Sequence, residues 1–262
     1  MTTTRESQYN FVEATVTLSD DRVIDIKHSI SELSLFEDIY NLGTSGKILV
    51  VDTQNIFNRV NITGVEILKL TIESGLDKPI GDPIEKSYIM TATLAANIVN
   101  DSTIAYVFEL QEEHIFQSKL EKISKAYNGT PLQIIGNICT GLLGRELDFE
   151  LIGSIRPTQS AMSVIVPYMN PVSAVQWIRN RLTTEAGHPY FVYGTVKSDK
   201  LMVNSLEAIR DSESPFQRAF TYGGAGQNSS DPVKQILAIE SLKNNTSSAT
   251  LTAIMGGAVG GR

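Results

Sequence analysis

Val-Glu-Ala-Thr-Val-Thr-Leu, residues 12–18, alternates at every step between an apolar and a polar side chain. Successive side chains of a β-strand point to opposite faces, so this alternation is typical of a strand with one buried face. Similar short runs follow at 24–30, 33–40, 47–51 and 65–72, and the run at 33–40 is expected to end in a helical turn. Short strands separated by turns predict a small antiparallel barrel or sandwich for this part of the chain.

Two longer runs, 88–99 and 103–110, flank the sequence Asn100-Asp101-Ser102. These three residue types tolerate the backbone geometry of tight turns, so the two runs are expected to form a β-hairpin. A long strand at the edge of a sheet would also offer unpaired backbone groups to a neighbouring chain.

The middle of the chain has the periodicity of helices. Apolar residues recur at near-helical spacing over 115–127, before Gly129. Thr130-Pro131 and Asn170-Pro171 each combine a preferred N-cap residue with a proline at the first helical position. They predict two further helices, and the second of these carries Trp177.

Further strands are expected in the second half of the chain. Residues 146–152 have the pattern of a strand, and 190–196 with 200–206 that of a hairpin. Residues 235–242 fit a strand almost as well as a helix that begins at Asp231-Pro232, and both alternatives stay open.

Together these elements predict an α+β fold with an N-terminal antiparallel β-barrel, a helical middle segment and a second partial β-barrel or sheet. The expected domains are a tube-type barrel over 1–111, a mixed helical connecting domain over 112–186, a second barrel-type domain over 187–245 and a Gly-rich tail over 246–262. The tail has too few large apolar side chains to offset the entropy lost on ordering, so it is expected to be flexible.

The composition argues against several classes of protein. Of the 262 residues, 42% are hydrophobic and 19% charged, and the formal net charge is −7. A chain of this charge without clustered Lys and Arg is not expected to grip nucleic acid phosphates. The single cysteine, Cys139, has no partner for a disulfide within the chain, and its apolar neighbours indicate a small buried hydrophobe. No apolar run reaches the roughly 20 residues that span a bilayer, and the polar N-terminus carries no signal core, so synthesis in the cytoplasm is expected.

One segment resembles a phosphate-binding loop but lacks two of its defining residues. Residues 43–48 are Gly-Thr-Ser-Gly-Lys-Ile. Asn41 stands where the motif has its first glycine, and Ile48 where it has the Ser or Thr that binds magnesium. A turn between two strands is the better interpretation.

The histidines and carboxylates do not form a recognisable reactive site either. His28, His114 and His188 are too far apart in sequence for the usual zinc spacing. The adjacent residues of Asp20-Asp21 and of Glu112-Glu113 would point to opposite faces of a strand. No catalytic, cofactor-binding or metal-binding residue is therefore assigned, although a glycosidase pair from two separate segments stays open.

The aromatic residues suggest packing before binding. Trp177 lies on the apolar stripe of a predicted helix, and this position favours packing in the core over a role as a binding platform. The run Tyr190-Phe191 with Tyr193 is more typical of a half-buried strand than of a face that stacks on sugars.

Several stretches, taken in order, resemble a family of phage proteins. A strand with an acidic turn at 34–40 is followed by Gly-x-Ile-x-Val-x-Asp at 46–52 and by a Gly-x-Glu strand within 62–68. An Asn-Pro helix at 170–178 then precedes the aromatic strand at 190–193. This order resembles the baseplate hub proteins of contractile-tailed, T-even-type bacteriophages, which are related to the hub of type VI secretion spikes. The resemblance covers roughly residues 10–210.

The resemblance implies a structural subunit, not an enzyme, and no cofactor. Hub proteins of this family form a homotrimeric ring with two related barrels per subunit, a collar that joins the hexameric tail tube to the trimeric spike. The partners implied are other copies of the chain, the tail spike protein, the tail tube or tube-initiator protein and the tape measure protein. DNA passes through the lumen without specific binding, no membrane is entered, and the location is the tail baseplate of the virion.

The C-terminal part departs from the family. Hub proteins are often longer, and a C-terminal segment completes their second barrel. In this chain either the second barrel is reduced or residues 217–251 supply its remaining strands.

Two other functions are kept as alternatives. One is a glycan- or receptor-binding tail protein that uses the aromatic strand near Tyr190 and Tyr193. The other is a baseplate-associated cell-wall hydrolase that uses a carboxylate such as Glu112.

Overall fold

The computed structural model describes most of the first 211 residues and two short pieces beyond them. The described ranges are 9–60, 62–74, 82–100, 103–149, 160–211, 221–222 and 235–236. Backbone contacts divide the chain into two compact units, residues 8–213 and residues 1–7 with 214–262.

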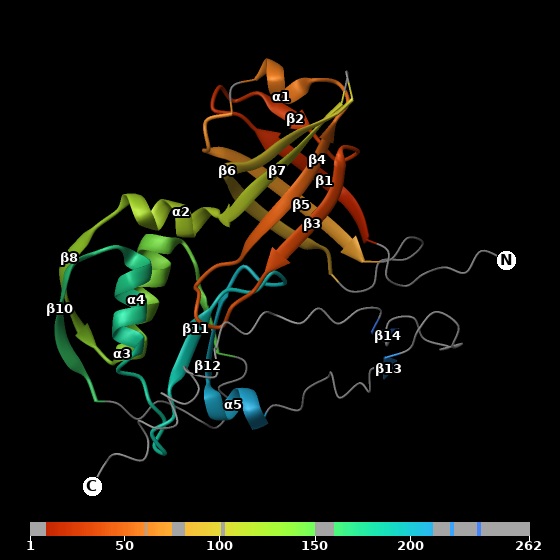
Figure 1. Ribbon diagram of the computed structural model, residues 1–262. Coiled ribbons are helices and arrows are strands. Elements are labelled where there is room, and N and C mark those ends of the chain that lie inside the picture. The colour runs from red at the N-terminus through yellow and green to blue at the C-terminus, as the bar shows by residue number, and fades with distance from the viewer. Residues whose placement is uncertain are drawn as a thin grey trace, which may run out of the picture. The chain divides into compact units, whose positions relative to one another are not determined.

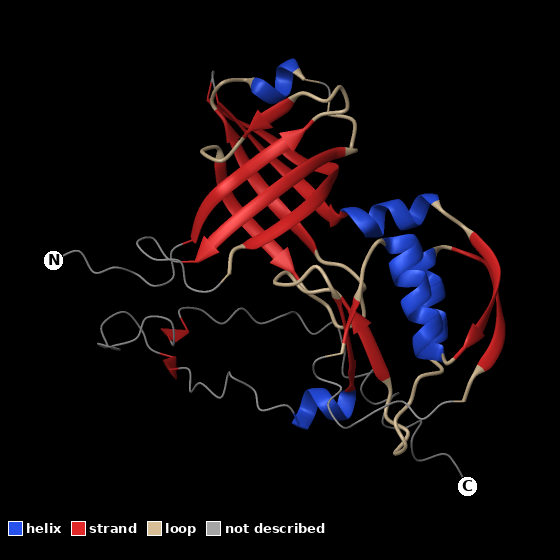
Figure 2. Cartoon of the chain, turned by 180° about the vertical axis from the view of Figure 1, so that it is seen from behind, coloured by secondary structure: helices blue, strands red, loops and turns tan. Residues whose placement is uncertain are grey.

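Seven antiparallel strands of the larger unit curl into a half-barrel (Figures 1 and 2). They lie in the order β2-β1-β5-β6-β7-β4-β3. In chain order the elements are β1 Tyr9–Thr17, β2 Val23–Asp25, β3 Ile30–Phe36, β4 Ser45–Asp52, α1 Ile56–Arg59, β5 Glu66–Ser74, β6 Ile84–Asn100 and β7 Thr103–Glu112. The antiparallel barrel expected from the sequence is therefore present as a curled sheet, and β6 with β7 forms the predicted hairpin.

The alternation in β1 predicts the buried face except at one residue. Ala14, Val16 and Leu18 are each 5% exposed or less, whereas Val12 is 44% exposed. The pairing of β1 with β5 shifts register between Phe11 and Glu13. This β-bulge changes the direction of the side chains that precede it, so Val12 faces outward.

The turn between the two edge strands β2 and β3 bonds to both sides of the curled sheet. The Ile26 N–H donates to the Ala14 carbonyl in β1 over 2.9 Å, and the Val51 N–H in β4 donates to the Ser29 carbonyl over 2.7 Å. The turn therefore links β1 to β4 at one end of the half-barrel.

A second core lies in the same unit and is built from short elements. These are α2 Glu113–Leu120, β8 Ile123–Gly129, α3 Pro131–Ile138, a π-helical turn Cys139–Leu143, β9 Leu147–Asp148, β10 Met162–Met169, α4 Pro171–Arg179, β11 Tyr190–Tyr193, β12 Leu201–Ser205 and α5 Leu206–Asp211. β8 pairs with β10, and β11, β12 and β9 form a three-stranded sheet. Both views show α3 and α4 between these two sheets (Figures 1 and 2). Ile134 and Ile138 of α3 and Val175 and Ile178 of α4 are fully buried in one core cluster.

Both predicted helix starts are confirmed. The Thr130 hydroxyl accepts the N–H of Gln133, whose side chain in turn accepts the Thr130 N–H, which is a capping box. At the start of α4, the Asn170 side chain accepts the N–H of Ser173. Each cap satisfies a backbone donor that the first helical turn leaves without a partner.

The helix predicted over 115–127 is wrong in its second half. α2 ends at Leu120, and residues 123–129 form β8, which pairs with β10. Tyr127, in the middle of β8, is buried against the second core. Cross-strand pairing with β10, about 40 residues later in the sequence, outweighs the local periodicity.

Two smaller expectations are also corrected. Residues 37–40 form a non-helical turn, because the Asp38 carboxylate accepts the Tyr40 N–H and the Asn41 side-chain amide. Of the strand expected over 146–152, the structure has β9 at Leu147–Asp148, and residues 150–152 lie outside the described ranges.

The C-terminal unit is described at two short strands only. β13 Thr221–Tyr222 pairs in parallel with β14 Gln235–Ile236. Residues 235–236 are therefore strand, while the expected Gly-rich tail lies outside the described residues.

The described residues are mostly β, with a few short helices, so the α+β prediction overstated the helical share. The second β-rich part is observed as the three-stranded sheet, and its barrel form stays a prediction. None of the helices in the described ranges has both the length and the hydropathy to cross a membrane.

The inward face of β4 provides a test of the half-barrel. Ile48 is fully buried and Lys47 beside it is exposed. We expect Ile48→Ala to lower the free energy of unfolding by about 2–5 kcal/mol, because it leaves a cavity in the core. Lys47→Ala, the matched control, should change it by about 0.5 kcal/mol or less. Urea denaturation of the full chain measures both, and equal effects would contradict the assigned faces.

Candidate functional site

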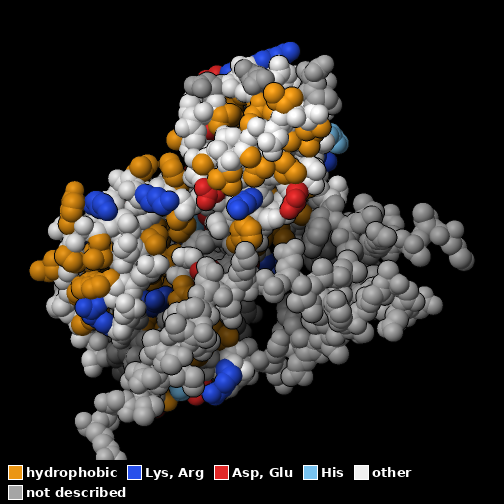
Figure 3. Space-filling view, viewed as in Figure 1, with side chains coloured by type: hydrophobic (Ala, Val, Ile, Leu, Met, Phe, Trp, Pro, Cys, Tyr) orange, Lys and Arg blue, Asp and Glu red, His pale blue; other side chains and the backbone are white. Residues whose placement is uncertain are grey.

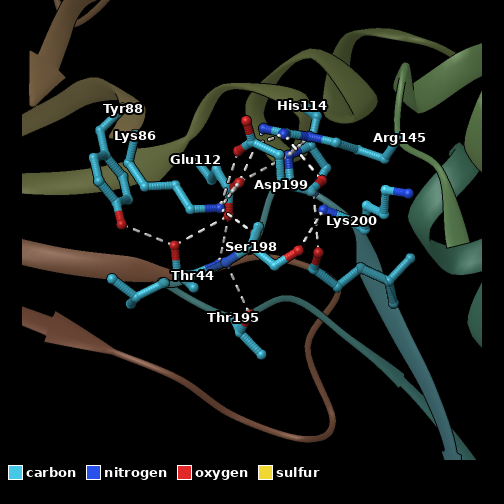
Figure 4. Close-up of polar contacts among 12 residues, drawn as sticks. Thr44, Lys86, Tyr88, Glu112, His114, Arg145, Thr195, Ser198, Asp199 and Lys200 are labelled. Atoms are coloured by element: carbon cyan, nitrogen blue, oxygen red, sulfur yellow. Dashed lines mark hydrogen bonds and ion pairs between the residues drawn. The ribbon is translucent and has the colours of Figure 1, made fainter. Parts of the chain in front are cut away.

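A cluster of charged side chains joins the half-barrel to the second core (Figure 4). Lys86 comes from β6 and Glu112 from the end of β7. Arg145 follows the π-helical turn, and Asp199 lies in the turn between β11 and β12. Four separate parts of the chain thus meet at one place.

Glu112 is the centre of this cluster and is 2% exposed. Its Oε2 accepts the Thr44 N–H over 2.9 Å and the Thr44 hydroxyl over 3.0 Å. Its Oε1 accepts Lys86 Nζ over 3.2 Å and Arg145 Nη2 over 3.0 Å. Charged and neutral donors therefore saturate a carboxylate that has almost no access to water.

Lys86 binds the second core directly. Besides Glu112, its Nζ donates to the Ser198 carbonyl over 2.7 Å and to Asp199 Oδ1 over 3.3 Å. The side chain of Lys86 is 2% exposed. All three donors of the ammonium group have partners, two of them in the turn after β11.

Arg145 makes the third set of bonds. Its Nη1 lies 2.9 Å from Asp199 Oδ1 and donates to the Asp199 carbonyl over 3.1 Å, while its Nε donates to His114 Nδ1 over 3.3 Å. With Nη2 on Glu112, the planar guanidinium bridges β7, α2 and the β11–β12 turn.

His114 is neutral in this environment. Burial lowers the pKa of its imidazole, and the charges of Arg145 and Lys86 lower it further, against opposing effects of Glu112 and Leu42. Nδ1 accepts from Arg145, so the proton is assigned to Nε2, which lies 3.0 Å from the Leu42 carbonyl. The 3.7 Å approach of Nδ1 to Glu112 is therefore not an ion pair at neutral pH.

Two neighbouring groups also have shifted pKa values. Burial raises the pKa of Tyr88, whose hydroxyl bonds to Thr44, to about 12. Partial burial opposes ionisation of Asp199, but Lys86 and Arg145 outweigh it and hold the pKa of that carboxyl below its usual value. Tyr88 thus stays neutral and Asp199 charged near neutral pH.

This cluster links the half-barrel to the second core, and we call Lys86, Glu112, Arg145 and Asp199 together the joint. Two carboxylates and two cations face one another, and each has a partner inside the protein. An open pocket of about 390 Å³ adjoins the joint, and Glu13, Lys69, Glu85 and Glu113 line it together with Lys86, Arg145 and Asp199. Because the charged groups are engaged with each other, they hold two parts of the chain in register.

The carboxylates considered in the sequence are not brought together. Glu112 is inside the joint, so it is not an accessible general acid, which argues against the hydrolase alternative. Asp20 and Asp21 lie in the exposed turn after β1, where Asp20 binds Arg22 over 2.8 Å.

The histidines and the cysteine are also separate. His28 is exposed, His188 half-buried and His114 buried. Cys139 is fully buried, and burial raises the pKa of its thiol to about 12, which agrees with a small hydrophobe. Among the described residues, no group of three His, Cys, Asp or Glu is placed to hold a metal ion.

The aromatic strand is more buried than a sugar-binding face would be. Tyr190, Phe191 and Val192 are 7% exposed or less. Tyr193 is half-buried, and its hydroxyl accepts the side-chain amide of Asn204 over 2.9 Å. These side chains pack inside the protein, which argues against the glycan-binding alternative.

Trp177 and residues 43–48 behave largely as expected. Trp177 is half-buried against the second core, with the Arg181 guanidinium 4.0 Å from the centre of its ring. Residues 43–48 form the turn into β4 and its first residues, not a loop before a helix.

Sequence reasoning missed Lys86, Arg145 and Asp199. A signal existed for Lys86, because it shares the inward positions of β6 with Ile84, Tyr88 and Met90. A lysine among apolar inward positions implies a buried partner. Arg145 and Asp199 lie in loops, where no periodicity marks them.

The buried ion pair can be compared with an exposed one of equal length. Lys86–Glu112 and Lys200–Glu146 both measure 3.2 Å, but their side chains are 2–3% and 53–69% exposed. We expect Lys86→Ala to lower the free energy of unfolding by about 3–5 kcal/mol, because it leaves a carboxylate buried beside fewer cations. Lys200→Ala should cost about 1 kcal/mol or less. Similar losses in denaturant titrations would show that the joint is open to water.

The neutral state of His114 predicts a dependence on pH. A histidine with a lowered pKa in the folded state stabilises the fold fully above its unfolded pKa of 6.5, and this stability is lost as the pH falls below that value. We expect thermal stability to fall between pH 7 and 5, and His114→Gln to make this fall shallower. His28→Gln, at an exposed position, should leave it unchanged. Parallel profiles for all three proteins would contradict this assignment.

No protein-family model and no curated protein matches the sequence. Solved structures do match. A 43 kDa tail protein of prophage MuSo2 from Shewanella oneidensis has 7% identity and a TM-score of 0.47, covering 73% of this chain and 54% of that one. A tail protein from Neisseria meningitidis MC58 has 10% identity and a TM-score of 0.42, covering 74% and 50%.

A third match is the Francisella PdpA–VgrG complex, with 12% identity and a TM-score of 0.40, covering 78% of this chain and 29% of the matched one. The chain spans about half the length of the tail proteins that it matches. Identities and TM-scores this low describe a distant likeness, from which no activity follows. The chain is similar in structure to phage tail proteins and to the VgrG complex.

Proposed function

We propose that this chain is a structural subunit of the baseplate hub in a contractile phage tail. Three copies form a collar that joins the hexameric tail tube to the trimeric spike and surrounds the channel for the tape measure protein and DNA. The chain is not an enzyme in this proposal, and it resides in the tail baseplate of the virion.

The observation that carries the proposal is the buried joint around Glu112. A subunit between tube and spike has to keep two binding parts in a fixed orientation while force passes through it. Here donors from Thr44, Lys86 and Arg145 converge on one carboxylate, and Lys86 and Arg145 also hold the β11–β12 turn. A buried network of this kind specifies one arrangement of its parts because any other leaves charges without partners.

The stretches that resemble hub proteins support the same proposal. Residues 34–40 and 46–52 cover the end of β3, the turn after it and most of β4. Residues 62–68 lead into β5, 170–178 form α4 with its cap, and 190–193 are β11. The resemblance thus falls on the elements that build the half-barrel and the second core.

The proposed partners follow from this position. They are two further copies of the chain, the tail spike protein, the tail tube or tube-initiator protein and the tape measure protein. The net charge of −7 suits a lumen along which DNA slides without being held. The division into 1–111, 112–186 and 187–245 belongs to the proposal, with the sheet of β11, β12 and β9 as the described part of a second barrel.

Mass and location test the proposal together. We expect native mass spectrometry of the full chain to detect three copies of the 28.7 kDa subunit. Cryo-electron microscopy of tail particles should place the chain between tube and spike. A chain that stays monomeric at high concentration and is absent from the tube–spike junction would contradict the proposal.

A further inference from the structure

We propose that two different faces of the chain bind each other in neighbouring copies, head to tail. One is an apolar mouth with acidic neighbours at one end of the half-barrel, and the other an apolar ribbon with basic neighbours on the second core. This inference rests on the proposed ring and names the surfaces that would close it.

The first face, the mouth, is a pocket of about 380 Å³. Its lining consists of carbon-rich side chains from four strands: Phe11, Leu33, Leu35, Ile72 and Ile84. The side chains that line this pocket are all apolar, so it suits apolar side chains of a partner.

The mouth lies where the curled sheet is incomplete. β2 covers β1 only at Thr15–Thr17, so within the described ranges the sheet pairing assigns no strand to the other side of the first half of β1. β3 is the opposite edge of the sheet. Phe11 of β1 and Leu33 and Leu35 of β3 line the pocket between these two edges. Incomplete sheet edges are places where another chain binds.

The chain neighbours of the mouth are acidic. Glu32, Glu73 and Glu85 directly adjoin lining residues, and Asp82 lies two residues before Ile84. Glu32, Asp82 and Glu85 are exposed, and Glu73 is half-buried. The one described basic residue within two positions of the lining is Lys86, which is buried in the joint. The mouth therefore favours a positively charged partner.

The second face, the ribbon, consists of the end of α2 with β8 and β10. Leu120, Ile165 and Tyr168 are 74%, 69% and 73% exposed. Figure 3 shows hydrophobic side chains gathered over this part of the molecule, with Lys and Arg side chains beside them. Large apolar side chains grouped on a surface mark a site of interaction.

The charge of the ribbon is opposite to that of the mouth. Lys119, Lys122 and Lys125 are exposed, and Glu121 is the one acidic residue among residues 119–125. The ribbon is thus locally basic on a chain whose net charge is −7.

The charges beside the mouth and the ribbon determine which of these faces can bind each other. Two mouths facing each other would bring acidic residues together, and two ribbons would bring lysines together, so pairing of like faces is unfavourable. Ribbon against mouth places lysines beside carboxylates and apolar side chains against an apolar pocket. A contact between two different faces of one chain is heterologous, and it closes into a ring when the rotation per copy allows.

A charge swap in the full chain tests the contact. The mouth variant carries Glu32→Lys and Asp82→Lys, and the ribbon variant Lys122→Glu and Lys125→Glu, all at exposed positions. We expect each pair alone to weaken self-association at least tenfold in sedimentation equilibrium, because like charges then oppose each other. The chain with all four substitutions has complementary faces again and should recover most of the association.

Two controls separate charge from packing. Glu185→Lys makes the same change at an exposed residue outside both faces and should leave association unchanged. Ile165→Ser removes an exposed apolar side chain and should weaken association also at high salt, where the charges are screened. Circular dichroism of each variant checks that the fold is kept.

The outcomes distinguish this inference from the proposed function. If the wild-type chain trimerises and lies between tube and spike, but neither charge pair affects association, the two faces do not meet and the hub proposal stands. If the mouth variant and the ribbon variant each lose self-association, but the chain with all four substitutions does not recover it, the pairing of ribbon with mouth is also overturned. A chain absent from the tube–spike junction contradicts the hub proposal, whether or not the swap restores association.

Discussion

The arrangement of the larger unit depends on one buried carboxylate. Removing Glu112 from water is unfavourable by several kcal/mol, and only the donors of Thr44, Lys86 and Arg145 offset this cost. Those donors belong to segments that have to arrive together: the turn before β4, strand β6 and the loop after the π-helical turn. The network adds little net stability by comparison with an apolar contact, but it makes every misaligned arrangement costly. Its physical role is therefore to select one arrangement of these segments.

A second set of contacts, from the turn after β3, fixes the same geometry. The Gly194 N–H donates to the Asn41 carbonyl over 3.1 Å, and a Cβ on Gly194 would lie 2.9 Å from the Leu42 carbonyl oxygen, so only glycine fits this approach. Glu37 accepts the Val196 N–H, and the Tyr40 ring meets Phe191 edge-on with centroids 5.5 Å apart. The turn after β3 thus binds β11 and the residues that follow it, while Lys86 and Arg145 hold the turn before β12. Two attachments along one hairpin restrict rotation, which a single attachment does not.

The sequence predicts local features of this fold well and the joint poorly. The periods of β1, β4 and the β6–β7 hairpin, and the Thr130-Pro131 and Asn170-Pro171 helix starts, are set by neighbouring residues, and the structure contains them. Residues 123–129 were predicted wrongly because their partner β10 begins only at residue 162, after α3 and β9. Lys86 could have been noticed as a charged residue in an inward series. Arg145 and Asp199 could not, since their importance comes from Glu112, which is 33 and 87 residues away in the sequence.

The joint and the incomplete sheet differ in what they leave available to a binding partner. In the Glu112 network Lys86, Arg145 and Asp199 are paired inside the protein, so these charged groups are not free to bind a partner. The mouth and the ribbon differ from this region. Leu120, Ile165 and Tyr168 of the ribbon are exposed, and the mouth is an open apolar pocket whose lining is half-buried except for buried Ile72. A protein that functioned alone would be expected to cover an open sheet edge and to disperse exposed Leu, Ile and Tyr side chains. Among the described residues, this chain pairs the charges of its interior and leaves apolar side chains on two unlike surfaces, a distribution that our proposal attributes to contacts with neighbouring copies.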